Sequence, residues 1–250
     1  MNKPIYRYLA QKKWESFQRK VVVQRINQLS IVPDVLPHFE PSADVRLAFR
    51  RKNVQPGNFV DSRISEVPAR LNVQVFDKGE RLVTVAVIDS DIPIVERDRF
   101  LPRLLYLATN ISLSPTDTSL PLSKVSLVNQ LVLPWLPPCA QKGSPYHRLS
   151  VFVLQQQPDQ RLDVEALKEK TQRDGFRLKS FVDRHCIQPI GVAIFRSIWD
   201  EGTADVMKRA GVEGADIEFK PKRIEPLKPK QKPRGWEAKH ASDKYLSLRR

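Results

Sequence analysis

Residues 82–93 read LVTVAVIDSDIP, a run of seven apolar or β-branched residues that ends in two closely spaced carboxylates and a proline. An apolar run of this length without alternation is typical of a strand that is buried on both faces of its sheet. The stretch therefore predicts a central buried strand, with Asp89 and Asp91 at its end.

Shorter stretches on either side alternate between apolar and polar residues. The stretches 45–49 and 71–75 place an apolar residue at every second position, which is the period of a half-buried strand. Residues 77–80 (DKGE) separate the second stretch from the buried run and predict a hairpin between them. Further strands are expected at 104–109, 147–154 and 191–198, and short helices near Asp163 and Thr203. The predicted fold is mostly β, an antiparallel β-sandwich with peripheral helices.

The segment before the first predicted strand reads as an amphipathic helix. Ala10, Trp14, Phe17 and Val21 recur at steps of four, three and four residues, and Val22, Ile26 and Leu29 continue on an adjacent strip, so they should form one apolar face of a helix between Tyr8 and Leu29. The opposite face is basic. Three interpretations remain open: a solvated charged face, a face that docks on phosphate, and a matrix-targeting presequence.

The excess positive charge of the chain lies at its two ends. Residues 1–28 hold seven Lys or Arg and one Glu, and residues 220–250 hold eleven Lys or Arg and three acidic residues. The whole chain has 42 basic and 28 acidic residues, so the part between the two ends holds 24 of each and is neutral. Cationic segments beside a neutral body suit a polyanion such as RNA, whose counterions they displace. The residues predicted to contact RNA are Lys12, Lys13, Arg19, Lys20, Arg25, Lys220, Lys222, Arg223, Lys228, Lys230, Lys232 and Arg234.

Length and composition predict three segments: a basic helical extension at 1–32, a β domain at 33–219, and a basic, Pro/Lys-rich extended tail at 220–250. Cys139 and Cys186 are too few and too isolated for a disulfide framework or a structural zinc site, which favours a reducing compartment. No apolar stretch approaches the length of a membrane span. We expect no metal and no cofactor.

Three motifs occur in order along the predicted domain: Asp89-Ser90-Asp91-Ile92-Pro93, then Gly143-Ser144-Pro145-Tyr146-His147-Arg148, and then Phe176-Arg177 followed by Gly191-Val192-Ala193. Together they resemble the phosphatidylethanolamine-binding protein family over residues 33–212. The first matches that family's D-P-D-x-P box with Ser90 in place of a proline, and the second matches its G-x-x-x-H-R box.

The resemblance implies a small anion pocket formed by Asp89, Asp91, Pro93, His147 and Arg148. Two departures from the family pattern, Leu105 in place of a histidine and Leu149 in place of an aromatic residue, indicate a vestigial pocket with no small-molecule ligand. The carboxylates would then form structural pairs with the His-Arg dipeptide. The sequence shows no nucleophile beside a base, so no catalytic residue is assigned and we predict that the chain is not an enzyme.

The two basic extensions resemble those of the branch of this family that is built into the large subunit of the mitochondrial ribosome. That resemblance implies a structural protein of the mitochondrial matrix, whose partners are ribosomal RNA and neighbouring ribosomal proteins. The alternative is a free phospholipid- or phosphate-binding module, or an enzyme inhibitor, with a working pocket. A hydrolase that uses Asp89, Asp91 and His147 is a third possibility, which would require a metal or a nucleophile.

Overall fold

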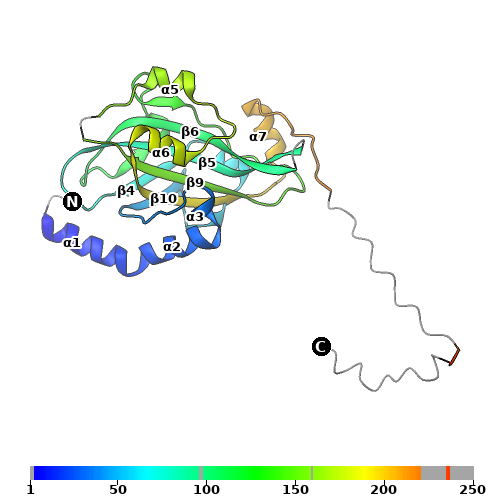
Figure 1. Cartoon of the computed structure of the whole chain (residues 1–250), viewed down its shortest axis with the longest axis horizontal. Coiled ribbons are helices and arrows are strands. Elements are labelled where there is room, and N and C mark those ends of the chain that lie inside the picture. Colours follow the sequence, from blue (N-terminus) through cyan, green and yellow to red (C-terminus); the bar gives the residue numbers. More distant parts are fainter. Residues whose placement is uncertain (1–2, 96–97, 159, 221–234, 237–250) are drawn as a thin grey trace. The chain divides into compact units, whose positions relative to one another are not determined.

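Two mostly antiparallel β-sheets pack face to face in a computed structural model that describes residues 3–95, 98–158, 160–220 and 235–236 (Figure 1). The smaller sheet has the strand order β2-β1-β4-β7, and the larger has the order β3-β10-β9-β5-β6-β8. The predicted antiparallel sandwich is confirmed; β3 is a short parallel addition to β10. The strands are β1 (Asp44–Phe49), β2 (Lys52–Val54), β3 (Asn58–Phe59), β4 (Arg70–Gln74), β5 (Arg81–Ile94), β6 (Arg99–Leu113), β7 (Ser119–Pro121), β8 (Leu131–Leu133), β9 (His147–Gln155) and β10 (Gln188–Ser197).

Strand β5 is buried on both faces, as its continuous apolar run predicts. Val83, Val85 and Val87 contribute to the core between the two sheets. Ala86 and Ile88 contribute to a second core on the outer face of the larger sheet. Because β5 lies between β6 and β9, it joins both cores in the middle of the sheet.

The prediction of a hairpin at residues 77–80 is wrong, because the strands on either side of this turn do not pair with each other. Strand β4 pairs with β1 and β7 in the smaller sheet, whereas β5 pairs with β6 and β9 in the larger one. The turn therefore carries the chain from one sheet to the other. An alternating strand followed by a polar turn and an apolar strand has the same local pattern in both arrangements, so the local sequence does not distinguish them.

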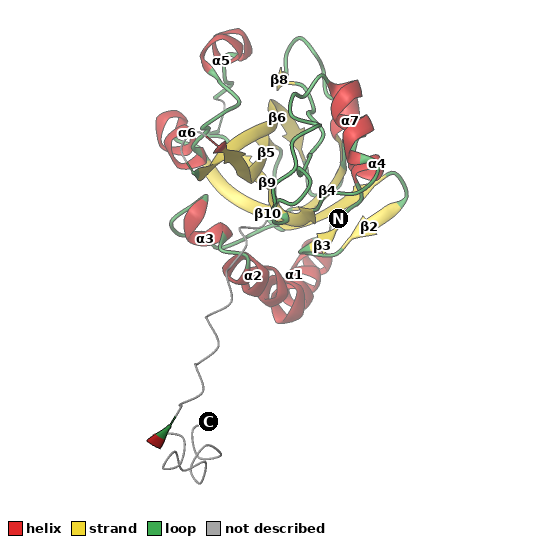
Figure 2. Cartoon of the chain, turned by 90° about the vertical axis from the view of Figure 1, so that its right-hand side faces the viewer, coloured by secondary structure: helices red, strands yellow, loops and turns green. Residues whose placement is uncertain are grey.

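The helices lie around the sandwich (Figure 2). Helices α5 and α6 cover the second core, to which they contribute Val164, Leu167, Leu178 and Phe181. Asp163 caps α5 by accepting hydrogen bonds from two backbone amides, as its position predicts. The helices are α1 (Pro4–Lys13), a π-helical turn η1 (Trp14–Gln18), α2 (Arg19–Gln28), α3 (Ile31–Asp34), α4 (Ser62–Ser65), the 3₁₀ turn η3 (Leu122–Lys124), α5 (Val164–Lys170), α6 (Leu178–His185) and α7 (Thr203–Ala210).

The N-terminal helix packs on the sandwich with a face that differs in part from the predicted one: Trp14 and Ile26 are buried as expected, whereas Phe17 is not. Trp14 is buried against Phe76, with ring centroids 5.3 Å apart, but Phe17 is 70% exposed. The residues that contact the domain include Arg7, Trp14, Arg19 and Ile26, at steps of seven, five and seven. The five-residue step coincides with η1, because a π-helical turn holds one residue more than an α-helical turn. The strict α-helical period therefore misplaced Phe17.

Among the described residues, no helix combines the length and the apolar character that crossing a membrane requires. Lys220 is the only member of the predicted tail contacts that lies within the described part of the chain. The other six, from Lys222 to Arg234, lie outside it.

Replacing Trp14 with Ala should release the N-terminal helix from the domain, because it removes the buried anchor at the π-helical turn. Limited proteolysis should then cleave residues 4–28 faster than in the wild-type protein. Phe17→Ala is the matched control, since it removes an aromatic ring that faces solvent three residues away. Equal cleavage of the two variants would contradict the assigned contact face.

Candidate functional site

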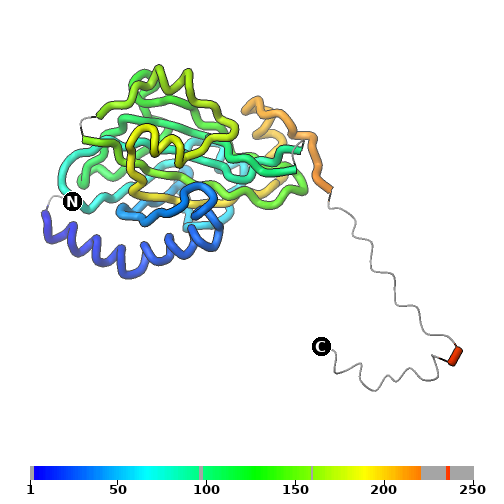
Figure 3. The backbone as a smooth tube through the Cα atoms, viewed as in Figure 1, coloured from blue at the N-terminus to red at the C-terminus, as the bar shows by residue number. Residues whose placement is uncertain are grey.

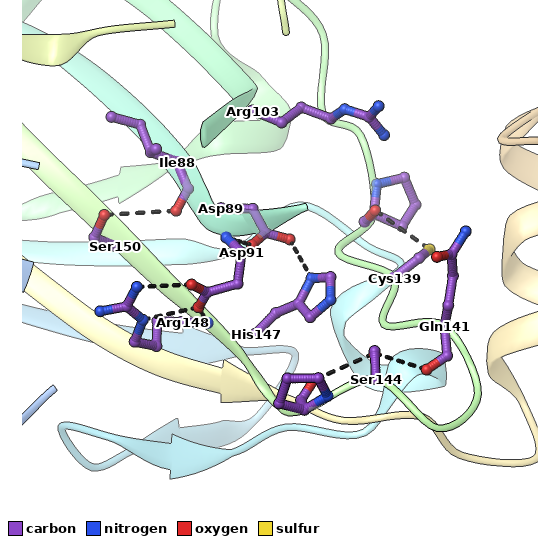
Figure 4. Close-up of polar contacts among 12 residues, drawn as sticks. Ile88, Asp89, Asp91, Arg103, Cys139, Gln141, Ser144, His147, Arg148 and Ser150 are labelled. Atoms are coloured by element: carbon purple, nitrogen blue, oxygen red, sulfur yellow. Dashed lines mark hydrogen bonds and ion pairs between the residues drawn. The ribbon is translucent and has the colours of Figure 1, made fainter. Parts of the chain in front are cut away.

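The first of two ion pairs joins Asp89 to His147: Asp89 was expected at the end of its strand but lies within the second half of β5, and His147 lies at the start of β9. The Nδ1 atom of His147 lies 2.8 Å from Oδ2 of Asp89, and both side chains have almost no exposed surface (Figure 4). Burial by itself lowers the pKa of His147, but the charge and the hydrogen bond of Asp89 outweigh it and raise the pKa. The pair therefore favours a protonated imidazole held by a carboxylate.

The second pair joins Asp91, two residues after Asp89, to Arg148, the residue after His147. The guanidinium of Arg148 binds Asp91 through Nε and Nη2 at 2.8 and 2.7 Å, and its backbone amide donates to the same carboxylate at 2.8 Å. Neighbouring residues of a strand point to opposite faces, so His147 and Arg148 need acceptors on two sides. The pairing of β5 with β6 shifts register between Asp89 and Ile92, and this bulge redirects Asp91 toward Arg148.

Arg148 also binds the segment that follows the N-terminal helix. Its Nη1 atom donates to Oδ2 of Asp34 and to the backbone carbonyl of Leu29, each at 2.8 Å. The hydrogen bonds with Asp91 and Asp34 and the charges of both carboxylates raise the pKa of Arg148, against the effect of burial. One guanidinium thus connects the second half of β5, the start of β9 and the C-terminal end of α2. Sequence analysis missed Asp34, which belongs to no motif.

A cavity of about 110 Å³ lies beside His147. Of the five predicted pocket residues, Asp89, Pro93 and His147 line it, whereas Asp91 and Arg148 do not. Leu105 lines it as well, and Leu149 is buried in the core between the sheets. The remaining lining residues are Ile92, Arg103, Leu136, Pro137, Cys139, Gln141, Met207, Val212 and Glu213.

The cavity is small for a ligand. Sites for small molecules usually occupy about 300–1,000 Å³, whereas this volume corresponds to roughly three or four waters at about 30 Å³ each. Within the described residues, Nε2 of His147 is buried without a hydrogen-bond partner. An imidazolium at this position could donate one hydrogen bond to a water or to a small anion.

The chemistry available around the cavity does not resemble an activated nucleophile. Burial raises the pKa of the Cys139 thiol to about 12, so the thiol is protonated and weakly nucleophilic at neutral pH. The Ser90 hydroxyl is buried and has no hydrogen-bond partner among the described residues. Across all residues that the structure describes, no cluster of three or more His, Cys, Asp or Glu could hold a metal ion. The geometry supports a structural role for the two ion pairs.

The predicted RNA-contacting residues of the N-terminal helix have different surroundings. Lys12, Lys13, Lys20 and Arg25 are exposed. Arg19 instead faces the domain, where it binds Glu40 at 3.0 Å and the Pro41 carbonyl at 3.2 Å. The charge of Arg19 is therefore partly neutralised within the chain.

Replacing His147 with Gln should remove a pH-dependent contribution to stability. The folded-state pKa of His147 is above its unfolded value of about 6.5, so its contribution is complete below that value and is lost as the pH rises through the folded-state pKa. We expect the substitution to lower the free energy of unfolding by about 1–3 kcal/mol at low pH, and by less at high pH. Urea denaturation between pH 5 and pH 9 measures this difference. A difference that does not shrink with rising pH would contradict the assignment.

Replacing Arg148 with Met should loosen the segment after α2, because Asp34 and the Leu29 carbonyl lose their shared donor. Amide hydrogen exchange of residues 29–35 should accelerate in Arg148→Met, and to a smaller extent in Asp34→Asn, which keeps the contact with Asp91. Unchanged exchange in this segment for both variants would show that Arg148 does not hold it.

Comparisons with known proteins agree with this architecture. Residues 50–193, more than half of the chain, match the family described as phosphatidylethanolamine-binding protein. The chain is 26% identical over 215 residues to the Large ribosomal subunit protein mL38 of Schizosaccharomyces pombe, a match that covers 82% of this chain and 66%, just under two thirds, of that protein.

Two solved structures have the same fold. One is a phosphatidylethanolamine-binding protein from Plasmodium falciparum (17% identity, TM-score 0.55, covering 70% of this chain and 96% of that one). The other is a carboxypeptidase Y inhibitor in complex with its cognate proteinase (13% identity, TM-score 0.55, covering 73% and 97%). The motifs around Asp89 and His147, the sandwich and the match over 50–193 lead to one conclusion: the chain belongs to the phosphatidylethanolamine-binding protein family.

Proposed function

We propose that this protein is a structural component of the large subunit of the mitochondrial ribosome and is located in the mitochondrial matrix. The observation that carries the proposal is the extent of its similarity to the fission-yeast ribosomal protein. That similarity covers 82% of the chain, whereas the family match spans 144 of its 250 residues. The similarity therefore reaches beyond the domain that ligand-binding members share.

In this role the sandwich is a scaffold, and its basic ends contact ribosomal RNA and neighbouring ribosomal proteins. Lys12, Lys13, Lys20 and Arg25 of the N-terminal helix are exposed and accessible to a partner, whereas Trp14, Arg19 and Ile26 contact the domain. The tail, residues 220–250, holds eleven Lys or Arg and only three acidic residues. A neutral body with cationic ends can hold RNA at its periphery without repelling protein neighbours elsewhere.

The pocket is vestigial in this proposal, and the ion pairs of Asp89 and Asp91 maintain the fold. The competing function, a phosphate- or phospholipid-binding module, is supported by Nε2 of His147, which lies at the cavity and has no hydrogen-bond partner within the described structure. The small volume argues against a lipid head group. Thermal unfolding with inorganic phosphate and with phosphoethanolamine separates the two functions, because a ligand that binds the native state raises the melting temperature. A saturable shift that is lost in His147→Gln would favour the module.

Deleting residues 220–250 should lower the affinity of the protein for RNA and reduce the dependence of binding on salt, because fewer phosphates are neutralised. Fluorescence anisotropy with a single-stranded RNA oligonucleotide at 50, 100 and 200 mM salt gives both quantities. A full-length variant in which Lys222, Arg223, Lys228, Lys230, Lys232 and Arg234 are all replaced with Gln is the matched control for chain length. An unchanged salt slope in both variants would contradict a role of the tail in RNA binding.

The proposed function as a whole is tested by sedimentation. The full-length protein should co-migrate with purified large mitochondrial ribosomal subunits and should remain bound after washing at moderate salt. A protein that stays entirely in the free fraction, while retaining its fold, would overturn the assignment.

A further inference from the structure

A groove of about 580 Å³ lies between α5 and α6, on the outer side of the larger sheet. The two helices lie next to each other in the perpendicular views of Figures 1 and 2, and Figure 3 traces the backbone that joins them. The loop before α5, both helices and the segment that connects them line the groove. The cations in its lining are Arg161, Lys170, Arg177 and Arg184.

These cations have no acidic partners in the described part of the chain, where no ion pair or side-chain hydrogen bond involves any of them. The two acidic residues of the lining are engaged elsewhere. Asp163 caps α5, and Asp174 forms an ion pair with Arg103. The groove therefore concentrates positive charge that the described structure does not neutralise, within a domain that is neutral as a whole.

His185 at the end of α6 responds to this positive charge. Its ring packs on Phe181 with centroids 4.7 Å apart, and its side chain is half-buried. Burial lowers the pKa of His185, and the charges of Arg184 and Lys170 lower it further. The charged groups that line the groove around it are Lys170 from α5, Arg177 and Arg184 at the two ends of α6, and Arg161, Asp163 and Asp174 from the connecting segments.

We propose that the groove between α5 and α6 binds the phosphate backbone of single-stranded RNA. Three of its four cations are arginines, whose planar guanidinium fork fits two phosphate oxygens at once. Gln160, Gln172 and Ser180 in the lining offer hydrogen bonds to sugar hydroxyls, and Phe176 offers a partly exposed ring for stacking of an unpaired base. This combination of cations, neutral donors and an aromatic ring suits RNA better than an acidic protein segment, which offers no base to stack. That the polyanion is RNA rests on the proposed function.

The first experiment compares two charge-matched variants of the full-length protein. Arg177→Gln/Arg184→Gln removes two groove cations, and Lys179→Gln/Lys208→Gln removes two exposed cations that do not line the groove. Binding of a single-stranded RNA oligonucleotide is measured by anisotropy between 50 and 200 mM salt. The groove variant should bind several-fold more weakly, with a salt slope about 1.4 smaller, because each phosphate contact on a single strand contributes about 0.7. Circular dichroism melts confirm that both variants are folded.

The second experiment reads the groove directly through the titration of His185. NMR follows the imidazole signal, assigned with a His185→Gln variant, in the free protein and with saturating RNA. A bound phosphate compensates the positive charge of Arg184 and Lys170, so the pKa of His185 should rise on binding. The rise should vanish in Arg177→Gln/Arg184→Gln and persist in Lys179→Gln/Lys208→Gln.

The outcomes test RNA binding at the groove separately from the ribosomal role of the protein. An unchanged pKa of His185 at saturating RNA, or equal affinities for the two variants, would overturn the proposal. A poly-glutamate peptide that raises this pKa at lower concentration than RNA does would overturn it in favour of an acidic protein segment. Failure of the protein to sediment with large subunits, while RNA still shifts His185, would refute the ribosomal role and leave the groove intact.

Discussion

The contact between Arg148 and Asp91 holds three parts of the chain in place at once. A carboxylate that is 9% exposed needs a paired cation, and Arg148 supplies two side-chain bonds and one backbone bond to it. The same guanidinium reaches Asp34 and the Leu29 carbonyl, which places the end of α2 against the strand ends of the larger sheet. Trp14 and Ile26 complete the attachment through apolar contacts.

The neighbouring pair, Asp89 with His147, differs from it in two ways: its side chains are more deeply buried, and they contact fewer partners. It is sealed beside a small cavity, and one ring nitrogen of the imidazole is left without a partner among the described residues. The bulge after Asp89 lets two carboxylates that are two residues apart serve two side chains that point in opposite directions. The motif thus performs two tasks with one local irregularity of the strand. One task pairs the buried His147 beside the cavity, and the other fixes a segment that lies outside the residues matched by the family.

Sequence reasoning recovered the parts of the structure that depend on local periodicity. The buried run from Leu82 to Ile88, the alternating strands and the Asp163 cap were all predictable, because burial and capping leave clear patterns in the sequence. The meeting of Asp89 with His147 followed from the family resemblance. The change of sheet at residues 77–80 could not be predicted, since a turn has the same composition whether it joins two strands of one sheet or two sheets. Asp34 belongs to no motif, and the groove cations lie on two helices and the segments that connect them, so only the tertiary fold shows what surrounds each of them.

The π-helical turn at Trp14–Gln18 fixes the phase of the N-terminal helix, that is, the rotation of α1 about the helix axis relative to α2. Each residue of an α-helix advances the side-chain direction by about 100°, so the extra residue in this turn sets how α1 is rotated relative to α2. Trp14 at the start of the turn and Ile26 beyond it reach the domain only at this rotation. The length of the segment between these two anchors is therefore as constrained as their identity. Insertion or deletion of one residue there would turn one anchor toward solvent, whereas a change of length before Arg7 leaves the phase untouched.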